Sequence, residues 1–176
     1  MGTGQFVSVA STLPDRVRWT REQAGKAGDQ ETLEALDDLA TVPADHLLLA
    51  TASLTNKYAM YPSDLDYAKH VRDFANSGGT DAADWNAGAA FTGPQLLPTL
   101  LGLDLRAIGI EMPVPFFVIQ GRDDHVTPPE PVATYVDDVK APAKAFVLID
   151  GGHYACFTRA GQSVAALREK VRPLVS

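Results

Sequence analysis

Two short and dense apolar runs constrain the fold of this 176-residue chain more than any other feature of its sequence. The first run covers residues 114–119 and the second covers residues 146–149, and both contain aromatic and β-branched residues. Continuous apolarity without alternation is typical of a strand that is buried on both faces, as in a parallel sheet. We therefore predict two buried, parallel strands in the C-terminal part of the chain.

A helix is expected between the two strands. Thr127, Pro128 and Glu130 stand where an N-cap hydroxyl, a first-turn proline and a capping-box glutamate are preferred. The apolar residues of this helix form one stripe that can pack on a sheet: Val132, Tyr135, Val136 and Val139. A last helix is expected to carry its stripe on Val164, Leu167, Val171 and Leu174. The resulting β-α-β-α order implies a crossover connection between parallel strands.

The first part of the chain has helical rather than strand periodicity. Short helices are expected around Leu33, Leu36 and Leu39, and further helices over 45–59, 63–75 and 84–101. The last of these is expected to be interrupted at Gly93 and Pro94. We predict an α/β chain with a mostly helical region at 1–105 and a β-α-β-α region at 106–176. Because two strands make a poor sheet alone, we expect further strands to come from a missing segment or a partner.

The net charge and the cysteine count restrict the partners and the cellular compartment that we expect for this chain. The formal net charge is −7, and no run of basic residues is present, which argues against nucleic acid or an anionic membrane as a partner. Cys156 is the single cysteine, so an intramolecular disulfide is impossible and a cytoplasmic location is favoured. Neither a membrane span nor a leader peptide is recognisable in the sequence.

The loops after the two strands carry the residues that could take part in catalysis. Asp124 follows the first strand and His153 follows the second. In parallel sheets such loops meet beyond the carboxyl ends of the strands, where ligands bind. A carboxylate that holds one imidazole nitrogen leaves the other nitrogen free to act as a general base. We predict that Asp124 and His153 form such a pair.

Two segments resemble the α/β-hydrolase superfamily, especially its capped proline iminopeptidase-like and epoxide hydrolase-like members. They are the run from Gly121 to Pro128, which is similar to the family's acid loop, and Gly151-Gly152-His153, which is similar to its histidine loop. The resemblance selects Asp124 over Asp123, because the family's acid follows the glycine by three positions. It also implies that residues 84–105 end a helical cap, and that residues 2–5 lead into it. By this resemblance the chain is a partial α/β-hydrolase fold, with a cap and the last two core strands.

The nucleophile half of that fold is missing from the sequence. Hydrolases of this superfamily carry a serine in a Gly-x-Ser-x-Gly elbow, and no such motif occurs here. Ser77 lacks the leading glycine, and Ser8 and Ser11 stand in no better context. The resemblance therefore implies acid and base without nucleophile or oxyanion hole, and a chain that is inactive alone.

Several of these residues also have a simpler interpretation. Asp124 alone is compatible with a turn former or helix cap, and Cys156 with a small buried apolar residue rather than part of a Cys-His dyad. A Mg²⁺ site at Asp123 and Asp124 lacks a supporting lysine or phosphate loop. The remaining histidines, His46, His70 and His125, have no metal-site spacing. No cofactor or metal is expected.

Two functions follow as expectations. The first is hydrolysis of a small ester, amide or aminoacyl bond, with Asp124 and His153 completed by a nucleophile-bearing N-terminal half. The second is a non-catalytic remnant or binding module that associates through its sheet edge, for example as a homodimer. A small-molecule substrate is expected for the first function.

Overall fold

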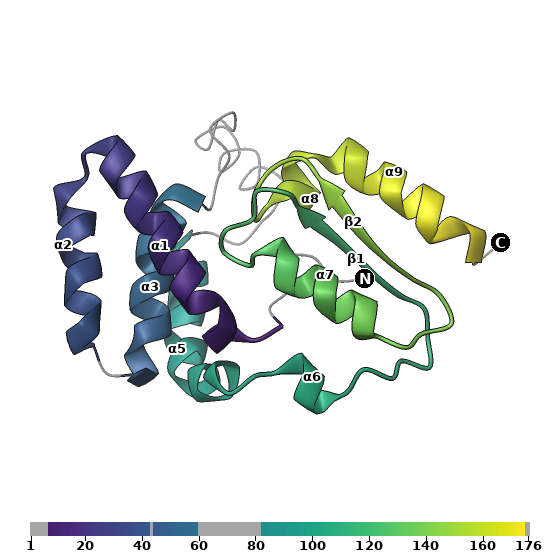
Figure 1. Ribbon diagram of the computed structural model, residues 1–176, viewed down its shortest axis with the longest axis horizontal. Helices are drawn as coiled ribbons and strands as arrows, with labels where there is room; N and C mark the ends of the chain where they lie inside the picture. Colours follow the sequence, from purple (N-terminus) through teal and green to yellow (C-terminus); the bar gives the residue numbers. More distant parts are fainter. Residues whose placement is uncertain (1–6, 43, 60–81, 175–176) are drawn as a thin grey trace.

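The computed structural model describes residues 7–42, 44–59 and 82–174 and shows a mixed α/β chain (Figure 1). The N-terminal part is helical and contains α1 (Val9–Ala27), α2 (Gln30–Asp38), η1 (Leu39–Thr41), α3 (Ala44–Ala59), α5 (Ala82–Leu101) and α6 (Leu105–Ile108). The C-terminal part contains β1 (Phe116–Gly121), α7 (Pro129–Asp138), β2 (Lys144–Ile149), α8 (Ala155–Thr158), α9 (Ala160–Lys170) and η2 (Arg172–Leu174). Among the described residues, no helix has the length and apolarity needed to cross a membrane.

The helices predicted around Leu33–Leu39, over 45–59 and over 84–101 are found, with one correction. Helix α3 matches the helix expected over 45–59, whereas the helix expected over 63–75 lies outside the described residues. Helix α5 runs unbroken through Gly93 and Pro94, so the predicted interruption is wrong. A proline inside a helix gives up one backbone hydrogen bond. The side chains of Thr92 and Gln95 donate hydrogen bonds to the carbonyls of Gly88 and Phe91, one turn earlier.

Helix α1 packs against both α2 and α3 in the helical part. A buried hydrogen bond of 2.9 Å joins the hydroxyls of Thr20 on α1 and Thr55 on α3. On the surface, Arg21 and Asp37 form an ion pair of 2.7 Å between α1 and α2. Helix α1 ends at Gly28, whose φ of +65° lies in the left-handed region that favours glycine.

The two predicted strands form a parallel pair with helices on both faces. The register runs from Phe116 opposite Lys144 to Gly121 opposite Ile149. On one face, a core cluster joins Val118 to the predicted stripe of α7. On the other face, Ile119 and Ile149 pack with residues of α8 and α9. Figure 1 shows α7 and α9 on either side of the strands. This arrangement confirms the α/β class but adds no third strand among the described residues.

Two packing details differ from the sequence prediction. Val7, at the start of the predicted cap region, is buried in the core cluster beside Val118. In the last helix, Val164 and Leu174 are exposed, while Ser163 and Ala166 are buried. The predicted stripe does not stay on one helix, because α9 ends at Lys170 and Leu174 lies in the separate turn η2.

Candidate active-site pair at the strand ends

The loops after β1 and β2 lie against one another. We call residues 122–128 the acid loop and residues 150–154 the histidine loop. The backbone N–H of Arg122 donates to the Ile149 carbonyl at 2.8 Å, and that of Asp123 donates to the Gly151 carbonyl at 3.0 Å. Gly151 has a φ of +103°, which a residue with a side chain rarely adopts. The end of the parallel pair therefore fixes the position of one loop relative to the other.

Asp124 organises the acid loop around a buried carboxylate. Its side chain is 0% exposed. Oδ1 accepts hydrogen bonds from the backbone N–H groups of Val126 (3.0 Å) and Thr127 (2.8 Å), and Oδ2 accepts one from the Thr127 hydroxyl at 2.6 Å. Asp124 therefore does form a turn, as the simpler interpretation required. The same contacts hold its carboxylate in one orientation.

The predicted N-cap role of Thr127 is wrong. Helix α7 begins at Pro129 with Pro128 before it, and no side chain caps its first turn. Because the Thr127 hydroxyl donates to Asp124 instead, it supports the candidate site rather than the helix.

His153 meets the carboxylate from the neighbouring strand end. Its Nδ1 atom lies 3.1 Å from Asp124 Oδ2 and 3.3 Å from Oδ1. The Thr127 hydroxyl oxygen is also 3.3 Å from this nitrogen. Since an ionised carboxylate only accepts hydrogen bonds, Nδ1 is assigned as the protonated nitrogen. This tautomer leaves Nε2 with a lone pair on a side chain that is 22% exposed. The structure thus brings together the two residues selected from the sequence.

No protein-family model, curated protein or solved structure significantly matches this chain. The relationship to α/β-hydrolases therefore remains a prediction from two loops.

The other candidates in these loops have different surroundings. Asp123 is exposed, in contrast to Asp124. His125 stacks on Trp19 of α1, with ring centroids 4.0 Å apart, and its burial lowers its pKa despite the carboxylates nearby. The Cys156 thiol donates to the Ile119 carbonyl at 3.7 Å and packs beside the Ile119 cluster. No group of three or more metal-ligating side chains occurs among the described residues. His70 and Ser77 lie outside them.

Sequence reasoning missed Arg16. This side chain is 1% exposed, and burial lowers its pKa while the charge of Asp124 raises it. Arg16 belongs to a buried stripe on α1 with Thr12, Thr20 and Ala24, at intervals of one turn. The four-residue spacing was a signal in the sequence. It was overlooked because a helix stripe is ordinarily sought among apolar residues.

Proposed function

We propose that this chain supplies the acid and the base of an α/β-hydrolase-type catalytic triad. His153 would act as general base and then general acid, and Asp124 would orient its ring and stabilise its cation. The reaction would be hydrolysis of a small ester, amide or aminoacyl bond. The nucleophile would be a serine in the N-terminal half of that fold, which these 176 residues do not include.

The observation that carries this proposal is the contact between His153 Nδ1 and a fully buried carboxylate at 3.1 Å. A carboxylate shielded from water interacts strongly with the imidazolium that forms during proton abstraction. The His153 side chain is 22% exposed, so the ring is only partly covered by the described residues.

Reconstitution tests the proposal directly. The chain is mixed with a polypeptide that carries the first six strands and the Gly-x-Ser-x-Gly elbow of a proline iminopeptidase-like hydrolase. Release of p-nitrophenol from its acetate ester is then followed. We expect turnover in the mixture and only background hydrolysis by either polypeptide alone. A complex that forms without turnover would contradict the proposal.

Substitutions then separate the roles of the two residues. Asp124→Asn and His153→Gln should each lower the turnover of the mixture by roughly 10⁴-fold, since either change disables the base. Asp123→Asn removes the adjacent, exposed carboxylate and serves as the matched control, with activity within about twofold of the original. Equal losses for Asp123→Asn and Asp124→Asn would count against a triad.

A second candidate function is association without catalysis. The sheet has two strands among the described residues, and the side chains of β2 are half-buried where those of β1 are buried. Large apolar side chains are also exposed on two helices: Phe91 and Leu96 on α5, and Phe157 on α8. Such surfaces commonly mark protein interfaces. The half-buried strand β2, which has one partner strand among the described residues, favours a module that pairs through the open side of β2.

The test of this second function is the oligomeric state. Phe116 N–H donates to Ala143 O and Arg122 N–H donates to Ile149 O, so odd-numbered residues of β2 face β1. The backbone N–H of Leu148 therefore points to the open side. Leu148→Pro removes that donor without breaking a β1–β2 hydrogen bond. We expect a dimer in analytical ultracentrifugation that this substitution converts to monomer; a monomeric original chain would exclude self-pairing.

A further inference from the structure

Gln120 is a polar residue in the otherwise apolar strand β1, and its side chain is buried. Only 1% of the residue is exposed. Burying a primary amide costs free energy unless its polar atoms have hydrogen-bond partners. The Oε1 atom of Gln120 has no such partner among the described residues. An apolar side chain would fill this place without that cost, so the contact of the other amide atom, Nε2, needs an explanation.

The Nε2 group donates a buried hydrogen bond to the backbone carbonyl of Thr127. The two residues are seven positions apart, and most of the acid loop lies between them. Because side chains alternate along a strand, Gln120 shares a face of β1 with Val118, which packs against α7. Helix α7 begins at Pro129, directly after this segment. The amide therefore ties the end of the acid loop to the strand from which the loop starts.

Thr127 connects this tie to the candidate pair. Its carbonyl accepts from Gln120, while its N–H donates to Asp124 Oδ1 at 2.8 Å and its hydroxyl donates to Oδ2 at 2.6 Å. The same Oδ2 atom lies 3.1 Å from Nδ1 of His153. A path of hydrogen bonds thus runs from strand β1 through Thr127 and Asp124 to the imidazole.

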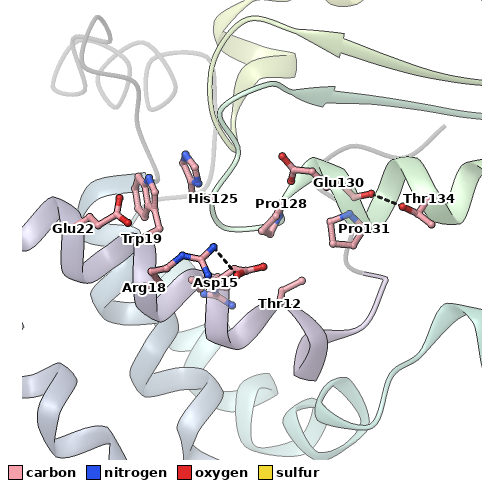
Figure 2. Close-up of a pocket in the computed structure, with 11 residues that line it drawn as sticks. Thr12, Asp15, Arg18, Trp19, Glu22, His125, Pro128, Glu130, Pro131 and Thr134 are labelled. Carbon is pink, nitrogen blue, oxygen red and sulfur yellow. Dashed lines mark hydrogen bonds and ion pairs between the residues drawn. The ribbon is translucent and has the colours of Figure 1, made fainter.

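The side of the acid loop that faces α1 is not closely packed. His125 and Pro128 line a cavity of about 520 Å³ between the loop and α1, and Gln120 is not among its lining residues (Figure 2). The His125 ring stacks on Trp19 at one end of this space. Van der Waals contacts are lost across a cavity. The position of the loop therefore depends more on its hydrogen bonds, including the one from Gln120.

We propose that Gln120 is a positioning residue for the Asp124–His153 pair. By holding the Thr127 carbonyl, it keeps the Thr127 N–H and hydroxyl directed at the carboxylate, and the carboxylate directed at Nδ1 of His153. A carboxylate at Nδ1 selects the tautomer that carries its proton there and leaves Nε2 as the base. The use of this tautomer in catalysis rests on the proposed function, whereas the tautomer itself is measured on the chain alone.

The test is the tautomer of His153 in Gln120→Met, which keeps the length of the side chain and removes the donor. Two-dimensional ¹H–¹⁵N spectra of the imidazole are recorded at about pH 8, above the pKa of an unperturbed histidine. We expect the Nδ1–H form in the original chain. In Gln120→Met the Nε2–H form, which free histidine prefers, should become the major one. A variant that keeps the Nδ1–H form would overturn the proposal.

The original chain separates this proposal from the proposed function. If His153 in the original chain already has the Nε2–H form, the Asp124–His153 pair itself is wrong, and both proposals fail. If only the variant differs from expectation, the pair stands and the role of Gln120 fails.

Val118→Ala is the matched control. Val118 lies on the same face of β1 and is 1% exposed, so loss of its methyl groups destabilises the fold. It makes no hydrogen bond through its side chain to the acid loop, and His153 should therefore keep the Nδ1–H form. An equal change of tautomer in both variants would mean that the pair responds only to stability, and would overturn the proposal.

If Gln120→Met does not fold, hydrogen exchange of the original chain decides. Gln95 provides the comparison, because its exposed side-chain amide also donates to a carbonyl. The Gln120 side-chain amide protons should exchange at least roughly tenfold more slowly than those of Gln95, since a buried hydrogen-bonded proton exchanges only when the structure opens. Equal exchange rates would show that Gln120 does not hold the loop, and would overturn the proposal.

Discussion

Gly121, at the end of β1, lies directly against the backbone of Gly152 in the histidine loop. A β-carbon added to Gly121 would come within 2.2 Å of the Gly152 carbonyl oxygen and 2.4 Å of the Gly151 carbonyl oxygen. Because both contacts are with backbone atoms, rotation of a side chain cannot relieve them. The close approach of the two loops, and with it the pairing of Asp124 and His153, depends on glycine at position 121.

We therefore predict that Gly121→Ala displaces the histidine loop and destabilises the fold by about 1–3 kcal/mol, or more if the strand end must separate. The free energy of unfolding in urea measures the change. Gly161→Ala is the control, because a β-carbon there meets no atom within 4 Å and Gly161 lies in helix α9. That substitution should stabilise by up to about 1 kcal/mol. Similar effects of both would show that the loop contact is unimportant.

The Thr127 hydroxyl supports the same carboxylate. Its hydrogen bond of 2.6 Å to Asp124 Oδ2 is buried, so Thr127→Val should cost about 1.5–3 kcal/mol of stability, as expected for a hydrogen bond to a charged group. The matched change is Thr134→Val on the exposed side of α7, where the hydroxyl donates to the Glu130 carbonyl. A change of about 0.5 kcal/mol or less is expected there. Urea unfolding of both variants gives the comparison; a Thr127→Val protein as stable as the original would argue against a tightly held carboxylate.

The strands and the pair were predictable because local signals and tertiary structure agree there. The run at 114–119 is apolar on both faces, and β1 is covered by α7 on one face and by α8 and α9 on the other. Asp124 and His153 follow directly from the positions of two parallel strand ends. The strands followed from their short, continuously apolar runs, whereas the choice of Asp124 over Asp123 needed the resemblance to the acid loop of α/β-hydrolases.

The predictions that failed concern residues whose local pattern differs from their place in the fold. Thr127 has the pattern of an N-cap, yet its hydroxyl donates to a buried carboxylate, which accepts a hydrogen bond more strongly than Thr127 could bond to its own helix. Pro94 has the pattern of a breaker, yet α5 continues through it. Arg16 is of a residue type usually found on the surface, and only its four-residue spacing from Thr12, Thr20 and Ala24 indicated a buried position.

The helical part has its own acid-sensitive contact. Asp29 caps α2 by accepting from Thr32 N–H, and Lys57 and Tyr58 of α3 also bond to its carboxylate. The Lys57 contact, followed by that of Tyr58, holds the Asp29 pKa well below its usual value. Because the folded pKa is lower than the unfolded one, near 3.9, this stabilisation is present above about pH 4 and is lost as pH falls through the folded value.

Asp29→Asn keeps a good N-cap residue and removes the charge. The stability difference between the original chain and this variant should be constant from pH 7 to about 5 and shrink below pH 4. Urea unfolding at several pH values measures it. Asp37→Asn, which removes the surface carboxylate that pairs with Arg21, is the control for general charge effects. An Asp29 difference that stays constant down to pH 2.5 would contradict the lowered pKa.

His125 should make the fold less stable in mild acid. Its burial against Trp19 disfavours the imidazolium and lowers its pKa, although Asp123, Asp124 and Glu130 oppose that effect. Between the folded pKa and the unfolded value near 6.5, the unfolded chain binds more protons, so stability falls as pH decreases. His125→Phe keeps a ring for the stack and removes the titration. The stability advantage of the original chain over this variant, measured by urea unfolding at pH 8, 7, 6 and 5, should therefore decrease below about pH 6.5. An advantage that grows toward pH 5 would show that the three carboxylates outweigh burial, and that the ring is charged while it stacks on Trp19.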